Sequence, residues 1–127
     1  MDNRQQAILY LTYLLVYSDG EFADKERHGI KYICQQEGIS EGEYEDFINN
    51  SQGSSERKLF DNGIDLIEKC SYEERISAFS WLYKLSEVDG KVHAKEVRFL
   101  LYSLRRASVD FEEVKTVAQA MPNLPSN

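Results

Sequence analysis

Four carboxylates that occur as two equally spaced pairs are the residues best suited to chemistry. Asp19 precedes Glu26 by the same interval at which Asp89 precedes Glu96, and the two pairs stand 70 residues apart. Carboxylate oxygens are the ligands that hard divalent cations such as Ca²⁺ and Mg²⁺ prefer. The four side chains could hold one such cation if the fold brings the pairs together, and His93 could join them. The sequence indicates no other cofactor.

The spacing of each pair also matches the second half of an EF-hand calcium loop. In that loop Asp and Gly occupy the fifth and sixth positions, and Glu occupies the twelfth. The first half of the loop does not match, because its first ligand would be Leu15 or Leu85. An aliphatic side chain cannot bind a hard cation, so we do not expect a working EF-hand.

The carboxylates belong to a longer segment that occurs twice in the chain. Identical residues recur at an offset of 70, namely Tyr13 and Tyr83, Leu15 and Leu85, Asp19-Gly20 and Asp89-Gly90, and Lys25-Glu26 and Lys95-Glu96. An internal repeat of this kind indicates that one structural unit has been duplicated. An apolar helical run precedes each Asp-Gly and another follows it, so the unit is predicted to be an αα-hairpin.

The hairpin also offers a structural explanation for its acids. Gly20 and Gly90 would end the incoming helices, since glycine readily adopts the left-handed conformation that follows a helix. The outgoing helices would begin near Ala23 and His93, which places a glutamate at about the third helical position. A carboxylate there can accept hydrogen bonds from free backbone N–H groups, and it lies in the positive end of the helix dipole. The structural and the metal-binding interpretations both stand.

Helical periodicity runs through the chain, and no stretch shows convincing strand alternation. The runs at 3–17 and 72–87 are apolar on nearly every face, which is typical of central helices, so we expect them to pack together. Further helices are predicted at about 23–37, 41–49, 55–69, 94–107 and 110–121, with the longest loop at 49–55. A break is possible at Asn62-Gly63, a poor pair for a helix interior.

The fold class is therefore all-α, a compact single-domain bundle of six to eight helices. We expect the domain to cover residues 1–122, built from two duplicated αα-hairpins at about 7–37 and 77–107 with Asp-Gly corners. Residues 123–127 are expected to form a flexible tail. The helix at 94–107 carries the apolar residues Val97, Leu100, Leu101 and Leu104. The tyrosines of the first helix are expected at core or half-core positions.

Composition limits the classes of function. The net charge of −7 over 127 residues argues against a nucleic-acid-binding protein. The apolar run 7–16 is too short to span a bilayer, and the N-terminus lacks the basic region of a secretory signal, so we expect a cytoplasmic protein without membrane insertion. Cys34 and Cys70 form no disulfide framework and are expected to be buried thiols.

Charge is unevenly distributed along the chain. The segment 32–55 contains five acidic residues and no Lys or Arg, whereas basic residues gather at Lys91, Lys95, Arg98, Arg105 and Arg106. Such runs form either solvated faces or patches for a partner.

The paired Asp-Gly units in a helical chain of this length resemble the TerB family, which includes tellurite-resistance protein TerB and the central region of the co-chaperone DjlA. The likeness covers about residues 7–117, although Ala23 and His93 stand where that family often has a Ser or Thr cap. The resemblance implies a compact helical domain of stress-response systems. It also implies possible metal binding by the acids of the units, which here are Asp19, Glu26, Asp89 and Glu96.

We therefore expect a non-enzymatic binding or scaffold module that is linked to a tellurite or general stress response and acts through charged surface patches. Its partner would be a protein, and it would be a monomer or homodimer. The alternative is a divalent-metal-binding domain that uses the paired carboxylates. An enzyme is not expected, because the sequence has no nucleophile elbow, phosphate-binding glycine loop or H-E-x-x-H motif.

Overall fold

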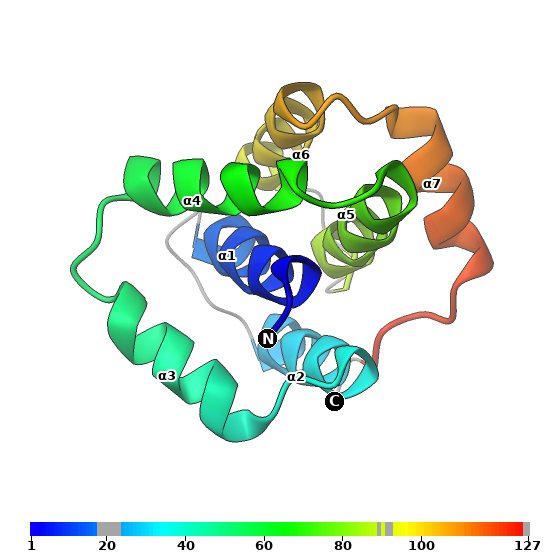
Figure 1. Cartoon of the computed structure of the whole chain (residues 1–127). Helices are drawn as coiled ribbons and strands as arrows, with labels where there is room; N and C mark the ends of the chain where they lie inside the picture. Colours follow the sequence, from blue (N-terminus) through cyan, green and yellow to red (C-terminus); the bar gives the residue numbers. More distant parts are fainter. Residues whose placement is uncertain (18–23, 89, 91–92, 126–127) are drawn as a thin grey trace.

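The computed structural model describes residues 1–17, 24–88, 90 and 93–125. This part of the chain contains seven α-helices and no strand (Figure 1). The helices are α1 (Asn3–Tyr17), α2 (Asp24–Glu37), α3 (Glu41–Ser51), α4 (Glu56–Glu68), α5 (Tyr72–Ser86), α6 (Ala94–Arg106) and α7 (Phe111–Ala120). The all-α prediction is confirmed, and the number of described helices lies within the predicted range.

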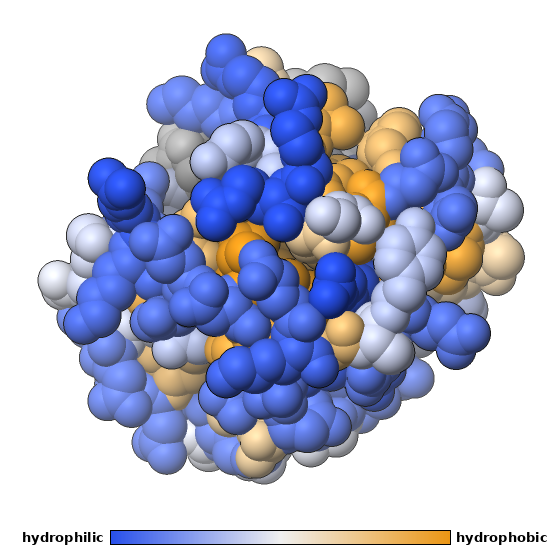
Figure 2. All heavy atoms as spheres, turned by 45° about the horizontal axis from the view of Figure 1, so that its top comes forward, coloured by the Kyte–Doolittle hydropathy of each residue, from blue (hydrophilic) through white to orange (hydrophobic). Residues whose placement is uncertain are grey.

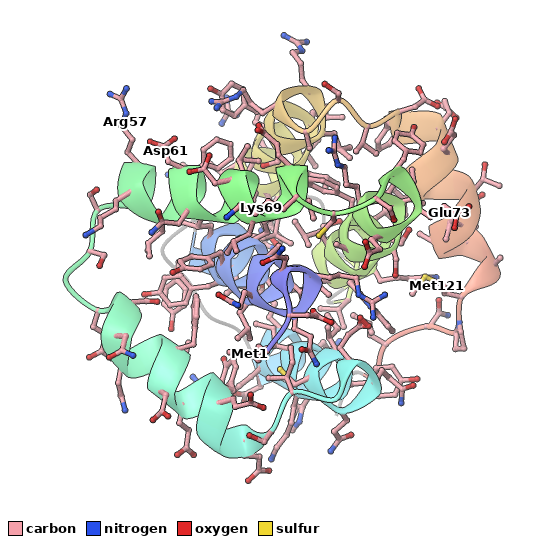
Figure 3. The ribbon with its side chains drawn as sticks, in the orientation of Figure 1. Met1, Arg57, Asp61, Lys69, Glu73 and Met121 are labelled. Carbon is pink, nitrogen blue, oxygen red and sulfur yellow. The ribbon has the colours of Figure 1, made fainter. Side chains whose placement is uncertain are left out.

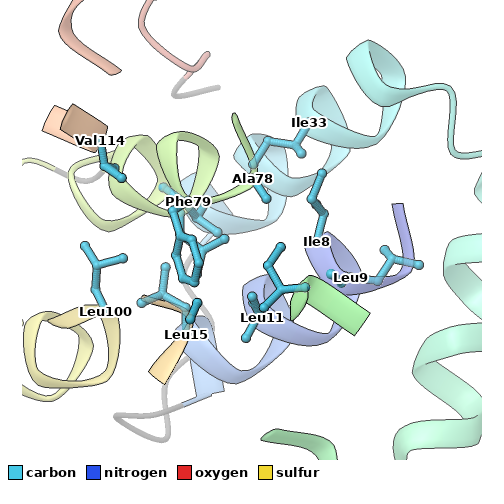
Figure 4. Close-up of a cluster of buried hydrophobic side chains, with 14 of the residues drawn as sticks. Ile8, Leu9, Leu11, Leu15, Ile33, Ala78, Phe79, Leu100 and Val114 are labelled. Atoms are coloured by element: carbon cyan, nitrogen blue, oxygen red, sulfur yellow. The ribbon is translucent and has the colours of Figure 1, made fainter. Parts of the chain in front are cut away.

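Helices α1 and α5 lie side by side at the centre of the bundle, as the sequence predicts. Helix α1 buries side chains on most of its surface, because α4 packs on one side of it and α5 on another. Leu15 and Phe79 meet in the centre of the core (Figure 4). Leu15 and its repeat mate Leu85 are both buried, which fulfils one requirement of the duplication.

Helix starts follow the local signals in the sequence. The Ser40 hydroxyl accepts a hydrogen bond from the Glu43 N–H at 3.1 Å, and the Glu43 carboxylate accepts one from the Ser40 N–H at 3.0 Å. Ser71 and Glu74 form the same capping box at the start of α5. Such caps satisfy backbone donors that have no partner within the helix, and therefore they fix where α3 and α5 begin.

Helix α4 continues through Asn62-Gly63, so the break considered there does not occur. A methyl group built on Gly63 would lie 3.0 Å from the Cβ atom of Tyr10 and 3.3 Å from the Cδ2 atom of Leu11. Glycine therefore allows α4 to pack closely against α1. Tertiary contact outweighs the low helix propensity of this pair.

The structure corrects the predicted ends of two segments. Helix α3 extends to Ser51, which is buried, so the loop after it is shorter than the predicted 49–55. The segment after α7 is not wholly a loose tail, because Leu124 is buried in the core and Lys84 donates a hydrogen bond to the Asn123 side chain at 3.2 Å. Apolar burial at Leu124 holds this segment against the bundle.

Aromatic side chains attach α3 to α1. The ring centroid of Phe47 lies 4.9 Å from that of Tyr10 and 5.8 Å from that of Tyr13. Tyr10 and Tyr13 are half-buried, which confirms the half-core assignment for them, whereas Tyr17 is exposed. Helix α3 therefore lies at the edge of the bundle (Figure 1).

The two predicted hairpins match in where their outgoing helices begin. Helix α2 begins at Asp24 and α6 at Ala94, which are again 70 residues apart. Gly90 has a φ of +75°, the left-handed conformation predicted for the end of the incoming helix. Gly20 and both corner aspartates lie outside the described residues, so the symmetry of the two corners stays a prediction.

Candidate functional site

Glu26 and Glu96 occupy equivalent places in the two hairpins. Each is the third residue of its helix, α2 or α6, as the sequence predicts. Both are almost completely buried, with exposed fractions of 3% for Glu26 and 1% for Glu96. A buried carboxylate is costly unless its charge is compensated, so this pair of positions is unusual in an otherwise apolar core.

Two features of the fold favour negative charge at Glu96. The first turn of α6 presents backbone N–H groups and the positive end of the helix dipole. The Nε2 atom of His93 lies 3.9 Å from the Oε2 atom of Glu96, close enough for an ion pair when the imidazole is protonated. His93 itself makes no side-chain capping hydrogen bond at the start of α6.

The four predicted metal ligands divide into two groups. Glu26 and Glu96 are placed in the core, whereas Asp19 and Asp89 lie outside the described residues. Within the described part of the chain, no three His, Cys, Asp or Glu side chains form a group that could hold a metal ion. The two glutamates fit a hard cation chemically, but a full ligand set would need the corner aspartates as well.

The thiols are buried as the sequence predicts. Burial raises the pKa of the Cys34 thiol to about 11, so the thiol is protonated at neutral pH and is a poor nucleophile. Cys34 contributes to a cavity of about 300 Å³ between α2 and α3, whose lining also includes Arg27, Lys31 and Tyr44. Lys31 and Glu41 form an exposed ion pair beside it, with 3.9 Å between Nζ and Oε1.

A second candidate region lies on the solvent side of α6. Val97, Leu101 and Tyr102 are exposed there to 38%, 46% and 52%, although large apolar side chains are usually buried. We define the α6 face as these three side chains together with the exposed arginines of the same helix, which are Arg98, Arg105 and Arg106. Figure 2 shows apolar patches among hydrophilic side chains. In this view the side of the molecule with α4 and α6 is turned forward.

Aromatic stacking holds the α6 face against α4. The Phe60 ring of α4 lies 5.4 Å from the Tyr102 ring and 5.9 Å from the Phe99 ring, measured between centroids. The guanidinium carbon of Arg106 lies 5.6 Å from the Phe60 centroid, and its Nη1 donates to the Tyr102 hydroxyl at 3.5 Å. Offset stacking and cation–π contact fix these side chains in place.

The aromatic cluster borders a cleft of about 400 Å³ between α4 and α6. Glu56, Arg57 and Asp61 of α4 line the cleft on the side opposite Tyr102 and Arg106. Arg57 and Asp61 extend outward from α4 (Figure 3). The α4 side of the cleft thus carries two acids and one arginine, whereas the α6 side carries Arg106.

The four apolar residues that the sequence names in the helix at 94–107 divide between core and surface. Leu100 and Leu101 differ by about 100° around the helix axis, and the packing of α6 decides which of them faces the core. Leu100 and Leu104 are buried, so Val97 and Leu101 lie toward solvent. The basic residues noted in this segment lie on the same exposed side.

Comparison with known proteins identifies one family. The family model described as tellurite resistance protein TerB matches residues 5–116. No curated protein and no solved structure matches significantly. In the described part of the chain, each helix is too short or too polar to cross a membrane.

Proposed function

This chain belongs to the TerB family, and we propose that it is a non-enzymatic binding module that acts in the cytoplasm in a tellurite or general stress response. Its contact surface would be the α6 face. A binding module needs an exposed surface on which a partner can bury apolar area, and it needs no reactive side chain.

One observation carries this proposal, the exposure of Val97, Leu101 and Tyr102 among arginines on a single helix. Clustered apolar side chains with polar neighbours mark interaction sites more often than isolated ones do. Arginine and tyrosine are also enriched in the central residues of protein interfaces. The raised pKa of Cys34 favours a structural rather than a nucleophilic role for that thiol.

Complementation of a strain that lacks the gene tests the proposal. Wild-type protein should restore growth on tellurite or an oxidant, and the double variant Val97→Ser/Leu101→Ser should not. Val117→Ser is the matched control, because Val117 is equally exposed but lies on α7. Equal protection by the wild type and the double variant would show that the α6 face is not the contact surface. No protection by the wild type would remove the stress-response link.

Divalent-cation binding by Asp19, Glu26, Asp89 and Glu96 is a second candidate function. It is supported by the burial of Glu26 and Glu96 at matching positions of the two hairpins. A cation that bound both corners would compensate two buried charges and stabilise the fold.

Thermal melting with EDTA and with millimolar Ca²⁺, Mg²⁺ or Mn²⁺ tests this second function. Binding at about 100 times Kd would stabilise the protein by about 2.7 kcal/mol. The rise in melting temperature should disappear in Asp19→Asn and in Asp89→Asn. A melting temperature that is the same with EDTA and with all three cations would exclude the site, and native mass spectra of the same samples would give the oligomeric state.

A further inference from the structure

The α6 face has a regular geometry. Residues four apart in a helix form a row on its surface, so Val97, Leu101 and Arg105 make one row. Arg98, Tyr102 and Arg106 make the adjacent row. The first row has two aliphatic side chains followed by an arginine, the second row has an arginine on each side of a tyrosine, and all six side chains are exposed.

The equivalent positions in the first hairpin are occupied differently. At the offset of 70, Arg27 and Lys31 of α2 correspond to Val97 and Leu101, and Gln35 corresponds to Arg105. Both outgoing helices bury their glutamate and their inner apolar residues. The aliphatic residues and the arginine of the α6 face are thus not required by the hairpin fold, and they need another explanation.

The charge of the α6 face contrasts with that of the whole chain. The protein has a net charge of −7, yet the exposed residues of α6 are Ala94, Lys95, Val97, Arg98, Leu101, Tyr102, Arg105 and Arg106, with no acid among them. The described ion pairs of α2, α1 and the start of α6 do not involve Arg98 or Arg105. A local basic surface on an acidic protein attracts an acidic ligand and orients it.

The face is also held in one conformation before any partner binds. Phe60 stacks on Tyr102, and Arg106 lies over the same Phe60 ring. Because these side chains are already ordered, binding would cost less conformational entropy than binding to a mobile surface.

We propose that the α6 face binds an acidic amphipathic helix of a partner protein, an inference that rests on the proposed function. Aliphatic side chains of that helix, spaced three or four residues apart, pack on Val97 and Leu101. Its carboxylates pair with Arg98 and Arg105, for which bidentate arginine–carboxylate contacts are favourable. Tyr102 lies in the second row, between Arg98 and Arg106.

The apolar row argues against a nucleic acid. Glu56 and Asp61 of the adjoining cleft stand beside Arg57 and Arg106, so the cleft does not repel an acidic ligand. A nucleic acid would offer phosphates to the arginines, but it has no aliphatic side chains to pack on Val97 and Leu101. A second copy of this chain could offer the acidic helix α3, but its apolar side chains pack inward against α1, so only its carboxylates would be available. An acidic helix with exposed leucines satisfies both rows of the face.

A labelled synthetic peptide tests the proposal with the full-length protein. The probe is a helix of about 16 residues, or roughly four turns, made of Leu on one face and Glu on the other. Fluorescence anisotropy should show binding that weakens as salt rises from about 50 to 300 mM. Control peptides carry Lys in place of Glu, or Ser in place of Leu, and both should bind at least about tenfold more weakly.

Paired variants locate the binding surface. Arg98→Gln/Arg105→Gln and Val97→Ser/Leu101→Ser should each weaken binding of the acidic peptide at least about tenfold. The matched controls Lys25→Gln/Lys69→Gln and Val117→Ser remove the same charge or apolar group from other exposed sites and should not weaken it. Circular dichroism melts identify any variant that fails to fold. If one double variant fails, the other one tests whether the peptide binds at the α6 face.

Several results would overturn the proposal. They are absence of peptide binding at about millimolar concentration, preference for the Lys peptide, stronger binding to anionic vesicles or single-stranded DNA, and self-association through the α6 face. If the wild type does not bind the peptide but Val97→Ser/Leu101→Ser loses stress protection, the proposed function stands and the partner is a different one. Peptide binding without any effect on stress protection would overturn the stress role instead.

Discussion

The two predicted hairpins, α1–α2 and α5–α6, share a few buried residues and differ at many other positions. Leu15 and Leu85 are both buried, as are Glu26 and Glu96. These two pairs keep the same residue, whereas other buried positions at the offset of 70 differ, such as Leu9 and Phe79 or Ile33 and Ser103. The two halves therefore share burial at these positions more than they share residue type.

The sides on which α2 and α6 meet other helices show a difference. A methyl group built on Gly29 of α2 would lie 2.9 Å from the Leu85 Cδ1 atom, so α2 approaches α5 closely. The equivalent residue of α6 is Phe99, whose ring packs against Phe60 of α4. The same position serves close helix packing in one hairpin and an aromatic contact in the other. Where the two predicted hairpins differ, each half thus meets different neighbours.

The largest effect is expected in the shared core. Leu15→Ala and Leu85→Ala should each lower the free energy of unfolding by about 2–5 kcal/mol, because each removes a fully buried side chain and leaves a cavity. Urea denaturation would measure both values. If one of the two costs less than about 1 kcal/mol, the hairpins do not contribute equally to the core.

The buried glutamates distinguish a structural from a metal-binding role. If both are structural, Glu26→Gln and Glu96→Gln should each cost about 1.5–3 kcal/mol in EDTA, the range for hydrogen bonds to charged groups. Carboxylates gathered for a cation would instead repel one another in EDTA, so either substitution would stabilise the protein. Chemical denaturation in EDTA, with Glu45→Gln as an exposed control on α3, gives the sign.

Local signals explain where sequence and structure agree, and tertiary contacts explain where they differ. The central helices, the capping boxes and the φ of Gly90 were predictable, because each depends on a local signal. Burial of Leu124 was not predictable, since it lies in an irregular segment between two prolines with no periodicity to assign it. Exposure of Leu101 depends on the direction from which α6 meets the bundle, which is a tertiary property.

A smaller effect is expected at the second corner. Gly90→Ala should destabilise the protein by about 1 kcal/mol, because alanine is strained at a φ of +75°. The added methyl group would meet no atom within 4 Å, so the cost would come from the backbone alone. Thermal melting of Gly90→Ala beside Gly20→Ala would show whether the first corner has the same requirement. A neutral Gly90→Ala would mean that alanine is tolerated there without strain.

The smallest effect is expected where the repeats differ most. The double variant Val97→Arg/Leu101→Lys gives α6 the residues that α2 has at the equivalent positions. Because Val97 and Leu101 are exposed, the free energy of unfolding should change by less than about 0.5 kcal/mol. Leu100→Ala, at the buried position next to Leu101, is the contrast and should cost about 2–5 kcal/mol.

Urea denaturation of these two variants therefore separates fold from function on a single helix. A stable Val97→Arg/Leu101→Lys protein would show that the aliphatic residues of the α6 face are not needed for folding, and that they are available for a partner. A loss above about 1 kcal/mol would mean that they pack against the bundle in solution, and the α6 face would then be part of the core.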